Sequence, residues 1–182
     1  LALKQCENYD IEEDKYLINN FIGVIYSLKN NQELARDYFE KSHQLNKKFE
    51  DPLKNLYIIY IRKKSYPEAI NIAQKLCNLN NSNDLFFYQL AYAYELNNNN
   101  LSAIEYYEKC KDLNGKNKLK ALNNIGNIYL KNNKPKTSLK YFLDANEILK
   151  NDKIITNNIL LNYIKLKNEN KSDEYFEISK KL

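Results

Sequence analysis

The chain has 182 residues, enough for one ordinary domain or an array of small units, and its 28 basic and 23 acidic residues give a net charge of +5. Three glycines and three prolines are too few for a many-turned β fold or a glycine-rich phosphate loop. Interspersed charges argue against a nucleic-acid-binding stripe, and no apolar run reaches the roughly 18 residues that membrane insertion requires.

Apolar residues at three- and four-residue spacing predict pairs of helices, helix A and helix B, joined by short turns. The predicted turns in chain order are "KNNQ" at 29–32, "KKSY" at 63–66, "NNNN" at 97–100, "KNNKP" at 131–135 and "NENK" at 168–171. Pro67 falls in the first turn of a helix B, where its missing N–H is tolerated and its fixed φ suits the helix. Pro52 and Pro135 stand in comparable places, so all three prolines mark helix starts.

The pairs repeat with a nearly constant period. Spacings of 34, 34, 35 and 34 residues separate five tyrosines, namely Tyr26, Tyr60, Tyr94, Tyr129 and Tyr163. Nine residues after each tyrosine comes a small residue: Ala35, Ala69, Ala103, Ser138 and Ser172. Four residues further on stand Phe39, Ala73, Tyr107, Phe142 and Phe176. Several columns that keep one register through five pairs predict an array of similar helical hairpins.

This pattern resembles the tetratricopeptide repeat, a 34-residue helix–turn–helix unit. The small residue of its helix A corresponds to Gly23, Ala91 and Gly126. The second pair has bulky Tyr57 at that place but Ala73 in helix B, an exchange that conserves core volume. The dominant spacing of 34 disfavours the pentatricopeptide repeat, whose usual period is 35.

The resemblance implies an all-α fold, a right-handed superhelical solenoid of about five stacked repeats. The expected repeats span residues 16–49, 50–83, 84–117, 119–152 and 153–182, the last being the weakest match and a capping hairpin. The fourth repeat is longer by one residue, which we assign to the loop at 114–117. Residues 1–15 are expected to be the second helix of a truncated preceding repeat.

By the same resemblance, the A helices line a concave groove that binds a peptide or helix of a partner protein, and the chain is a non-catalytic scaffold or adaptor. The positions expected to line it are Asn20, Phe21, Lys54, Asn55, Ile58, Arg62, Tyr88, Gln89, Tyr92, Lys120, Asn123, Asn124, Asn127 and Asn158. The first half of this set is apolar and aromatic, and the second half is mostly amide.

Alternatives stay open at these positions. The asparagines also fit a compositional bias on a tolerant surface, and Tyr88 and Tyr92 also fit packing against a neighbouring helix. Lys54, Gln89, Lys120 and Asn124 approximate the carboxylate clamp of some family members, but Ile58 stands where that clamp needs an asparagine. The runner-up function is a structural or self-associating scaffold, a homo-oligomer that uses its convex face or terminal hairpins.

Chemistry-bearing residues are sparse. Cys6, Cys77 and Cys110 are odd in number and far apart, and His43 is the only histidine. We therefore expect no disulfide framework, metal site, cofactor or catalytic activity. Unpaired cysteines favour a cytoplasmic location over a periplasmic or membrane-anchored parent protein, and the absence of an initiator methionine suggests an excerpt of a longer chain.

Overall fold

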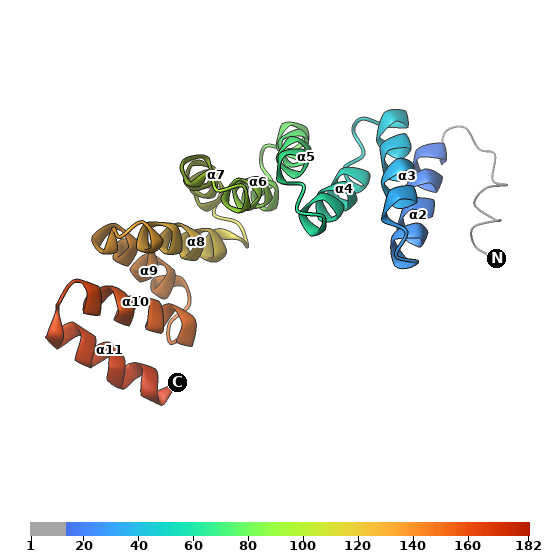
Figure 1. The fold of residues 1–182 in the computed structure, drawn as a ribbon. Helices are drawn as coiled ribbons and strands as arrows, with labels where there is room; N and C mark the ends of the chain where they lie inside the picture. The colour runs from blue at the N-terminus through green and yellow to red at the C-terminus, as the bar shows by residue number, and fades with distance from the viewer. Residues whose placement is uncertain (1–13) are drawn as a thin grey trace. The chain divides into compact units, whose positions relative to one another are not determined.

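The computed structural model describes residues 14–182, and these residues form helices and connecting turns without strands (Figure 1). The helices are α2 (Lys15–Leu28), α3 (Gln32–Leu45), α4 (Asp51–Arg62), α5 (Tyr66–Leu79), α6 (Asp84–Leu96), α7 (Asn100–Asp112), α8 (Lys118–Lys131), α9 (Pro135–Ile148), α10 (Lys153–Lys165) and α11 (Glu169–Lys181). The helix expected over residues 1–15 falls almost wholly outside the described residues.

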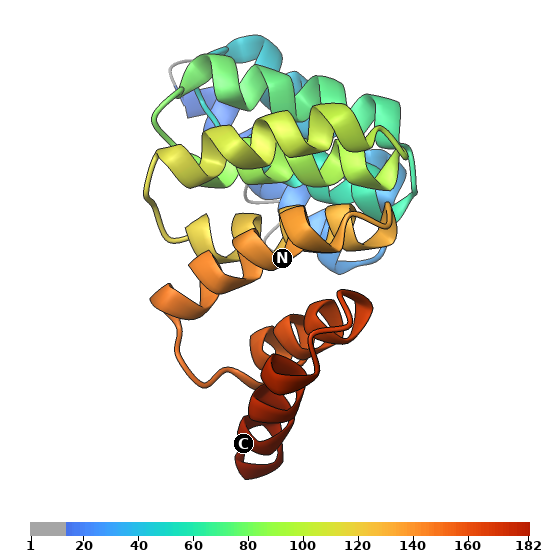
Figure 2. The ribbon, with the colours of Figure 1, turned by 90° about the vertical axis from the view of Figure 1, so that its left-hand side faces the viewer.

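The chain divides into two compact units. Of the described residues, unit 1 contains residues 14–82 together with Tyr92–Asn98, and unit 2 contains Asn83–Ala91 together with Asn99–Leu182. In unit 1, α2 packs on α3, α3 on α4 and α4 on α5. In unit 2, α7 packs on α8, α8 on α9, α9 on α10 and α10 on α11. Figures 1 and 2 show the hairpin form of α2–α3, α4–α5, α8–α9 and α10–α11, here numbered one, two, four and five.

The small residue of helix A leaves room for the aromatic ring of helix B. A methyl group at Gly23 would lie 2.6 Å from Phe39 Cε1, and one at Gly126 would lie 2.8 Å from Phe142 Cζ. Both rings are buried, so each glycine is required by a close approach of the two helices. In hairpin two the sizes are reversed, and Tyr57 and Ala73 are both buried as the expected exchange requires.

The repeated tyrosines also pack against helix B. In hairpins one, four and five their rings contact a second tyrosine twelve residues later at centroid distances of 5.5–5.6 Å, in the pairs Tyr26–Tyr38, Tyr129–Tyr141 and Tyr163–Tyr175. Such contacts between aromatic rings add about 0.5–1.5 kcal/mol beyond the buried area. They give a physical reason for the tyrosine in these three hairpins; in hairpin two the residue twelve positions after Tyr60 is Ile72.

Each A–B turn contains a residue with left-handed backbone. The positive φ angles are 60° at Asn30, 58° at Lys64, 61° at Asn98, 54° at Asn133 and 55° at Lys167. In the first turn, the N–H of Asn31 donates to the carbonyl of Tyr26 at 2.9 Å, and the N–H of Asn30 donates to Ser27 at 3.0 Å. This pair of bonds is the Schellman pattern that closes a helix C-terminus.

Asparagine suits these turns for two physical reasons. It tolerates the left-handed region better than most residues, and its side chain can cap the next helix. The side chains of Asn31, Asn99 and Asn168 accept hydrogen bonds from backbone N–H groups in the first turns of α3, α7 and α11. Because Asn168 is a cap, the last turn lies at residues 166–168, and the expectation of 168–171 was displaced by two residues.

The turn of hairpin two offers a test of this backbone argument. Lys64 has a φ of 58° without the local hydrogen bonding that helps asparagine there, so we expect Lys64→Gly to raise the free energy of unfolding by about 1 kcal/mol. Lys63→Gly removes the same charge at a position where φ is −75°. We expect it to lower the free energy of unfolding by about 0.5–1 kcal/mol. Urea denaturation followed by circular dichroism measures both, and equal effects of the two changes would contradict the prediction.

Hairpin five departs from the others. None of the residues of α11 is buried, and the side chain of Phe176 is 49% exposed although it keeps the spacing of Phe39 and Phe142. Within residues 14–182, none of the helices has both the length and the apolar character that a membrane span requires.

Candidate functional site

The expected groove positions in unit 1 differ in how much surface they offer. Phe21 on α2 is 60% exposed, and Ile58 on α4 is 44% exposed. Arg62 is also exposed, and Tyr92, near the C-terminal end of α6, is 36% exposed. The neighbouring residues Ile22 and Ile59 are buried, so Phe21 and Ile58 lie at the edge of the core and turn outward. These side chains present large apolar surface to solvent.

Two pairs of the predicted asparagines bond to each other. Asn55 Nδ2 on α4 donates to Asn20 Oδ1 on α2 at 3.2 Å, and Asn20 is buried. Asn158 Nδ2 on α10 donates to Asn123 Oδ1 on α8 at 3.3 Å. The partners in both pairs are 35 residues apart, one more than the 34-residue period, so the same bond joins one repeat position to the next position along the following A helix. An amide has two donor hydrogens and an acceptor oxygen, so each pair keeps further hydrogen-bonding capacity.

Tyr88 and Asn124 pack within unit 2. Asn124 Nδ2 donates to the Tyr107 hydroxyl at 2.8 Å and to the Tyr88 hydroxyl at 3.3 Å. The Tyr88 and Tyr107 rings have their centroids 5.5 Å apart, and Lys120 Nζ lies 6.0 Å from the Tyr88 centroid. Tyr88 therefore packs against a neighbouring helix, as the alternative interpretation allows. Gln89 and Asn127, the other expected positions in unit 2, are half-buried.

Lys54 is held by carboxylates of its own helix region. Its Nζ lies 3.0 Å from Glu50 Oε2 and 3.1 Å from Asp51 Oδ1. Partial burial lowers the pKa of Lys54, but the hydrogen bonds to Glu50 and Asp51 outweigh it, so the pKa is raised above its usual value. The ammonium stays charged and is neutralised locally, which weakens its use in a carboxylate clamp.

A match to a family model over three segments of the sequence decides the family. The model of the tetratricopeptide repeat matches residues 17–49, 86–117 and 119–151, which together make up more than half of the chain. The chain belongs to the tetratricopeptide repeat family. Members of this family mediate protein–protein interactions, so the chain is a protein-interaction scaffold module with an all-α solenoid fold.

Solved tetratricopeptide repeat structures are similar in fold. The crystal structure of MamA aligns with a TM-score of 0.81 at 17% identity over 92% of this chain and 91% of that one. YrrB, described as a TPR protein with an unusual peptide-binding site, aligns with a TM-score of 0.73 at 19% identity over 98% and 91%. The APC/C hetero-tetramer Cut9–Hcn1 aligns with a TM-score of 0.66 at 18% identity, over 98% of this chain and 35% of that one. No curated protein matches the chain by sequence.

The tetratricopeptide array holds its described cysteines in the core. Burial and, secondarily, the charge of Asp84 raise the pKa of Cys110 to about 12, so the thiolate that a nucleophile requires is absent near neutral pH. Cys77 is also buried. Residues 14–182 contain no cluster of three or more histidine, cysteine, aspartate or glutamate side chains that could hold a metal ion.

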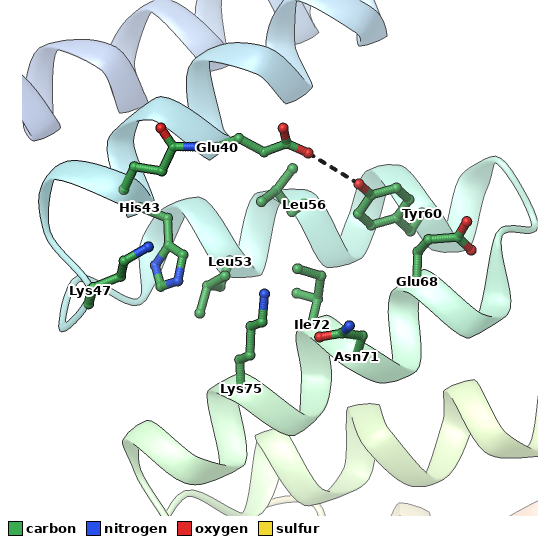
Figure 3. A pocket seen from close by; sticks show the side chains of 11 residues that line it. Glu40, His43, Lys47, Leu53, Leu56, Tyr60, Glu68, Asn71, Ile72 and Lys75 are labelled. Carbon is green, nitrogen blue, oxygen red and sulfur yellow. Dashed lines mark hydrogen bonds between the residues drawn. The ribbon is translucent and has the colours of Figure 1, made fainter.

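One cavity in unit 1 was not predicted from the sequence. A cavity of about 300 Å³ lies among α3, α4 and α5, and none of the residues that line it was assigned to the groove (Figure 3). His43 and Lys47 are four residues apart and share a face of α3, a signal visible in the sequence. Lys75 joins them only because α5 packs beside them, and residue spacing alone does not supply that geometry.

Proposed function

We propose that this chain binds a peptide or helix segment of a partner protein on the face formed by its A helices, and so acts as a scaffold or adaptor. The observation that carries the proposal is the exposure of Phe21, Ile58 and Tyr92, at 60%, 44% and 36%. Water-exposed aromatic and aliphatic side chains of this size bury much area on binding at low entropic cost.

The amides would supply the polar part of the contact. An extended peptide has unpaired backbone N–H and C=O groups, and asparagine side chains can donate to one and accept from the other. The pairs Asn20–Asn55 and Asn123–Asn158 hold their side chains in a defined orientation through mutual hydrogen bonds. Such pre-organised amides lose less side-chain entropy on binding than freely rotating ones.

Selection from a random peptide library against the 182-residue chain, followed by measurement of dissociation constants, tests the proposal. We expect Phe21→Ser/Ile58→Ser/Tyr92→Ser to weaken binding of the selected peptides by at least about tenfold, because exposed apolar anchors dominate such contacts. Leu101→Ser is the matched control, since Leu101 on helix B α7 is 85% exposed and lies outside the A helices. Unchanged affinity in the triple variant, with its fold intact by thermal melting, would reject the A-helix face.

Self-association is the second candidate, and hairpin five favours it. Ile164 on α10 and Phe176 on α11 are 55% and 49% exposed, so this hairpin presents apolar side chains to solvent. A second copy could cover them. Sedimentation velocity of the wild-type chain distinguishes the candidates, because an adaptor stays monomeric until a peptide binds and a self-associating scaffold does not.

A further inference from the structure

The cavity among α3, α4 and α5 has an apolar floor. Leu53 and Leu56 come from α4 and Ile72 from α5, and all three are buried in unit 1. Figure 3 shows these side chains between the two B helices, with polar side chains around them. An opening of about 300 Å³ above such a floor is large enough to take one or two amino-acid side chains.

Positive charge gathers at one end of this cavity. His43 and Lys47 come from α3 and Lys75 from α5, and in Figure 3 Lys47 extends toward the His43 ring while Lys75 extends from α5 toward Leu53. Among residues 14–182, no carboxylate forms an ion pair with Lys47 or Lys75. The Nδ1 atom of His43 is buried and has no hydrogen-bond partner within the same residues. This end therefore has two uncompensated charges and an unsatisfied polar atom.

The opposite end carries negative charge, and one of its two carboxylates, Glu40, already has partners. The Tyr60 hydroxyl donates to Glu40 Oε1 at 3.4 Å, the bond drawn in Figure 3, and Arg36 Nε lies 3.9 Å from the same carboxylate oxygen. Glu68 on α5 also lines this end. The cavity is thus polarised along its length, with His43, Lys47 and Lys75 at one end and Glu40 and Glu68 at the other.

The equivalent place in unit 2 does not share this character. There a cavity of about 610 Å³ lies among α7, α8 and α9 and is lined by both signs of charge, including Asp112, Asp144 and Glu147. Lys111 forms ion pairs with Glu108 and Asp112. The uncompensated cationic end therefore belongs to hairpins one and two and is not a general consequence of stacking the hairpins.

We propose that the cavity among α3, α4 and α5 is a second docking site, which takes an acidic segment of a partner protein with a carboxylate next to an apolar side chain. The carboxylate would lie against Lys47, Lys75 and His43, and the apolar side chain would cover the floor. Charge complementarity selects this occupant, because a carboxylate supplies the counter-charge that the chain itself does not. The site is formed by two B helices and α4, and it does not depend on the A-helix face.

The histidine gives this site a direction of pH dependence. Burial, and then the charges of Lys47 and Lys75, lower the pKa of His43 below its usual value of 6.5. His43 is therefore neutral at neutral pH, and acidification adds a third positive charge beside the bound carboxylate. Binding should strengthen as the pH falls from about 7.5 toward about 5.5, a range in which ligand aspartates stay ionised. The other titratable groups that line the cavity are Glu40, Tyr60 and Glu68.

Fluorescein-labelled dodecapeptides provide the test. Each contains an Asp-Asp pair placed one to four positions from a Leu-Leu pair in a Gly/Ser background, and a matched set has asparagine in place of aspartate. We expect the aspartate set to bind the 182-residue chain in fluorescence anisotropy and the asparagine set to bind more weakly. Lys47→Gln/Lys75→Gln should weaken binding by about tenfold or more. His43→Gln should leave the affinity at about pH 7.5 within about twofold and abolish the gain at about pH 5.5.

Two control variants separate this site from a general loss of positive charge and from the A-helix face. Lys136→Gln/Lys140→Gln removes the same charge from exposed positions of α9, and Phe21→Ser/Ile58→Ser removes the A-helix anchors; both should keep the affinity. The proposal is overturned if aspartate and asparagine peptides bind equally, if Lys47→Gln/Lys75→Gln still binds, or if either control loses binding to the same extent. It is also overturned if the chain binds no peptide and instead self-associates through Lys47 and Lys75, because the occupant is then a second copy.

Discussion

Replacing Phe142 by alanine is expected to lower the free energy of unfolding by about 3–5 kcal/mol, because its buried ring fills the centre of hairpin four. Gly126→Tyr alone should also destabilise the chain strongly, since even a methyl group there would lie 2.8 Å from the Phe142 ring. The double variant places tyrosine opposite alanine, the arrangement of Tyr57 and Ala73 in hairpin two. We expect it to lose about 2 kcal/mol less than the sum of the single losses.

Urea denaturation of the four chains, followed by far-UV circular dichroism, gives this coupling energy. Gly126→Tyr combined with Phe39→Ala is the control, because Phe39 lies against Gly23 in hairpin one and has no contact of this kind with position 126. In this control, the losses in free energy of unfolding caused by the two single changes should add within about 0.5 kcal/mol. Additivity in the Gly126–Phe142 pair as well would show that volume exchange does not explain hairpin two.

The hairpin cores could be predicted because their packing requirements recur at the same positions of successive repeats. At Gly23 and Phe39, and again at Gly126 and Phe142, a close approach of two helices requires one small and one large residue, and both requirements are visible in the sequence. Phe176 shows where this reasoning ends. Leu160 stands where hairpins one and four have glycine, so this hairpin lacks the small residue that admits the ring there, and Phe176 is half exposed.

The candidate site was less accessible to sequence reasoning, for a geometric reason. Periodicity identifies which residues lie near the exposed face of an A helix, but it does not give the distance between successive A helices. That distance decides whether Asn55 stands alone or is already oriented by a bond to Asn20, and here the two amides are 3.2 Å apart. The cationic cavity is similar, since Lys75 meets His43 only through the packing of α3, α4 and α5.

The connection between α7 and α8, residues 113–117, is held in place by one carboxylate. Asp84 Oδ2, in the first turn of α6, accepts a hydrogen bond from the backbone N–H of Asn117 at 2.7 Å and another from its side-chain amide at 3.2 Å. Gly115 lies against the same carboxyl group, and any Cβ there would collide with it. Asn117 is buried, so its N–H has no ready access to water if the carboxylate is removed.

We therefore expect Asp84→Ala to lower the free energy of unfolding by about 2–3 kcal/mol, since it leaves a buried donor without its charged acceptor. Asp84→Asn keeps an acceptor oxygen and should lose about half as much. Asp51→Ala is the control, because Asp51 occupies the first turn of α4 but pairs only at the surface with Lys54, a contact worth less than about 1 kcal/mol. Urea denaturation gives the three values, and hydrogen exchange at the Asn117 amide gives the local effect. If Asp84→Ala lost no more stability than Asp51→Ala and the Asn117 amide stayed protected, the extra residue of the fourth repeat would be accommodated by the loop alone.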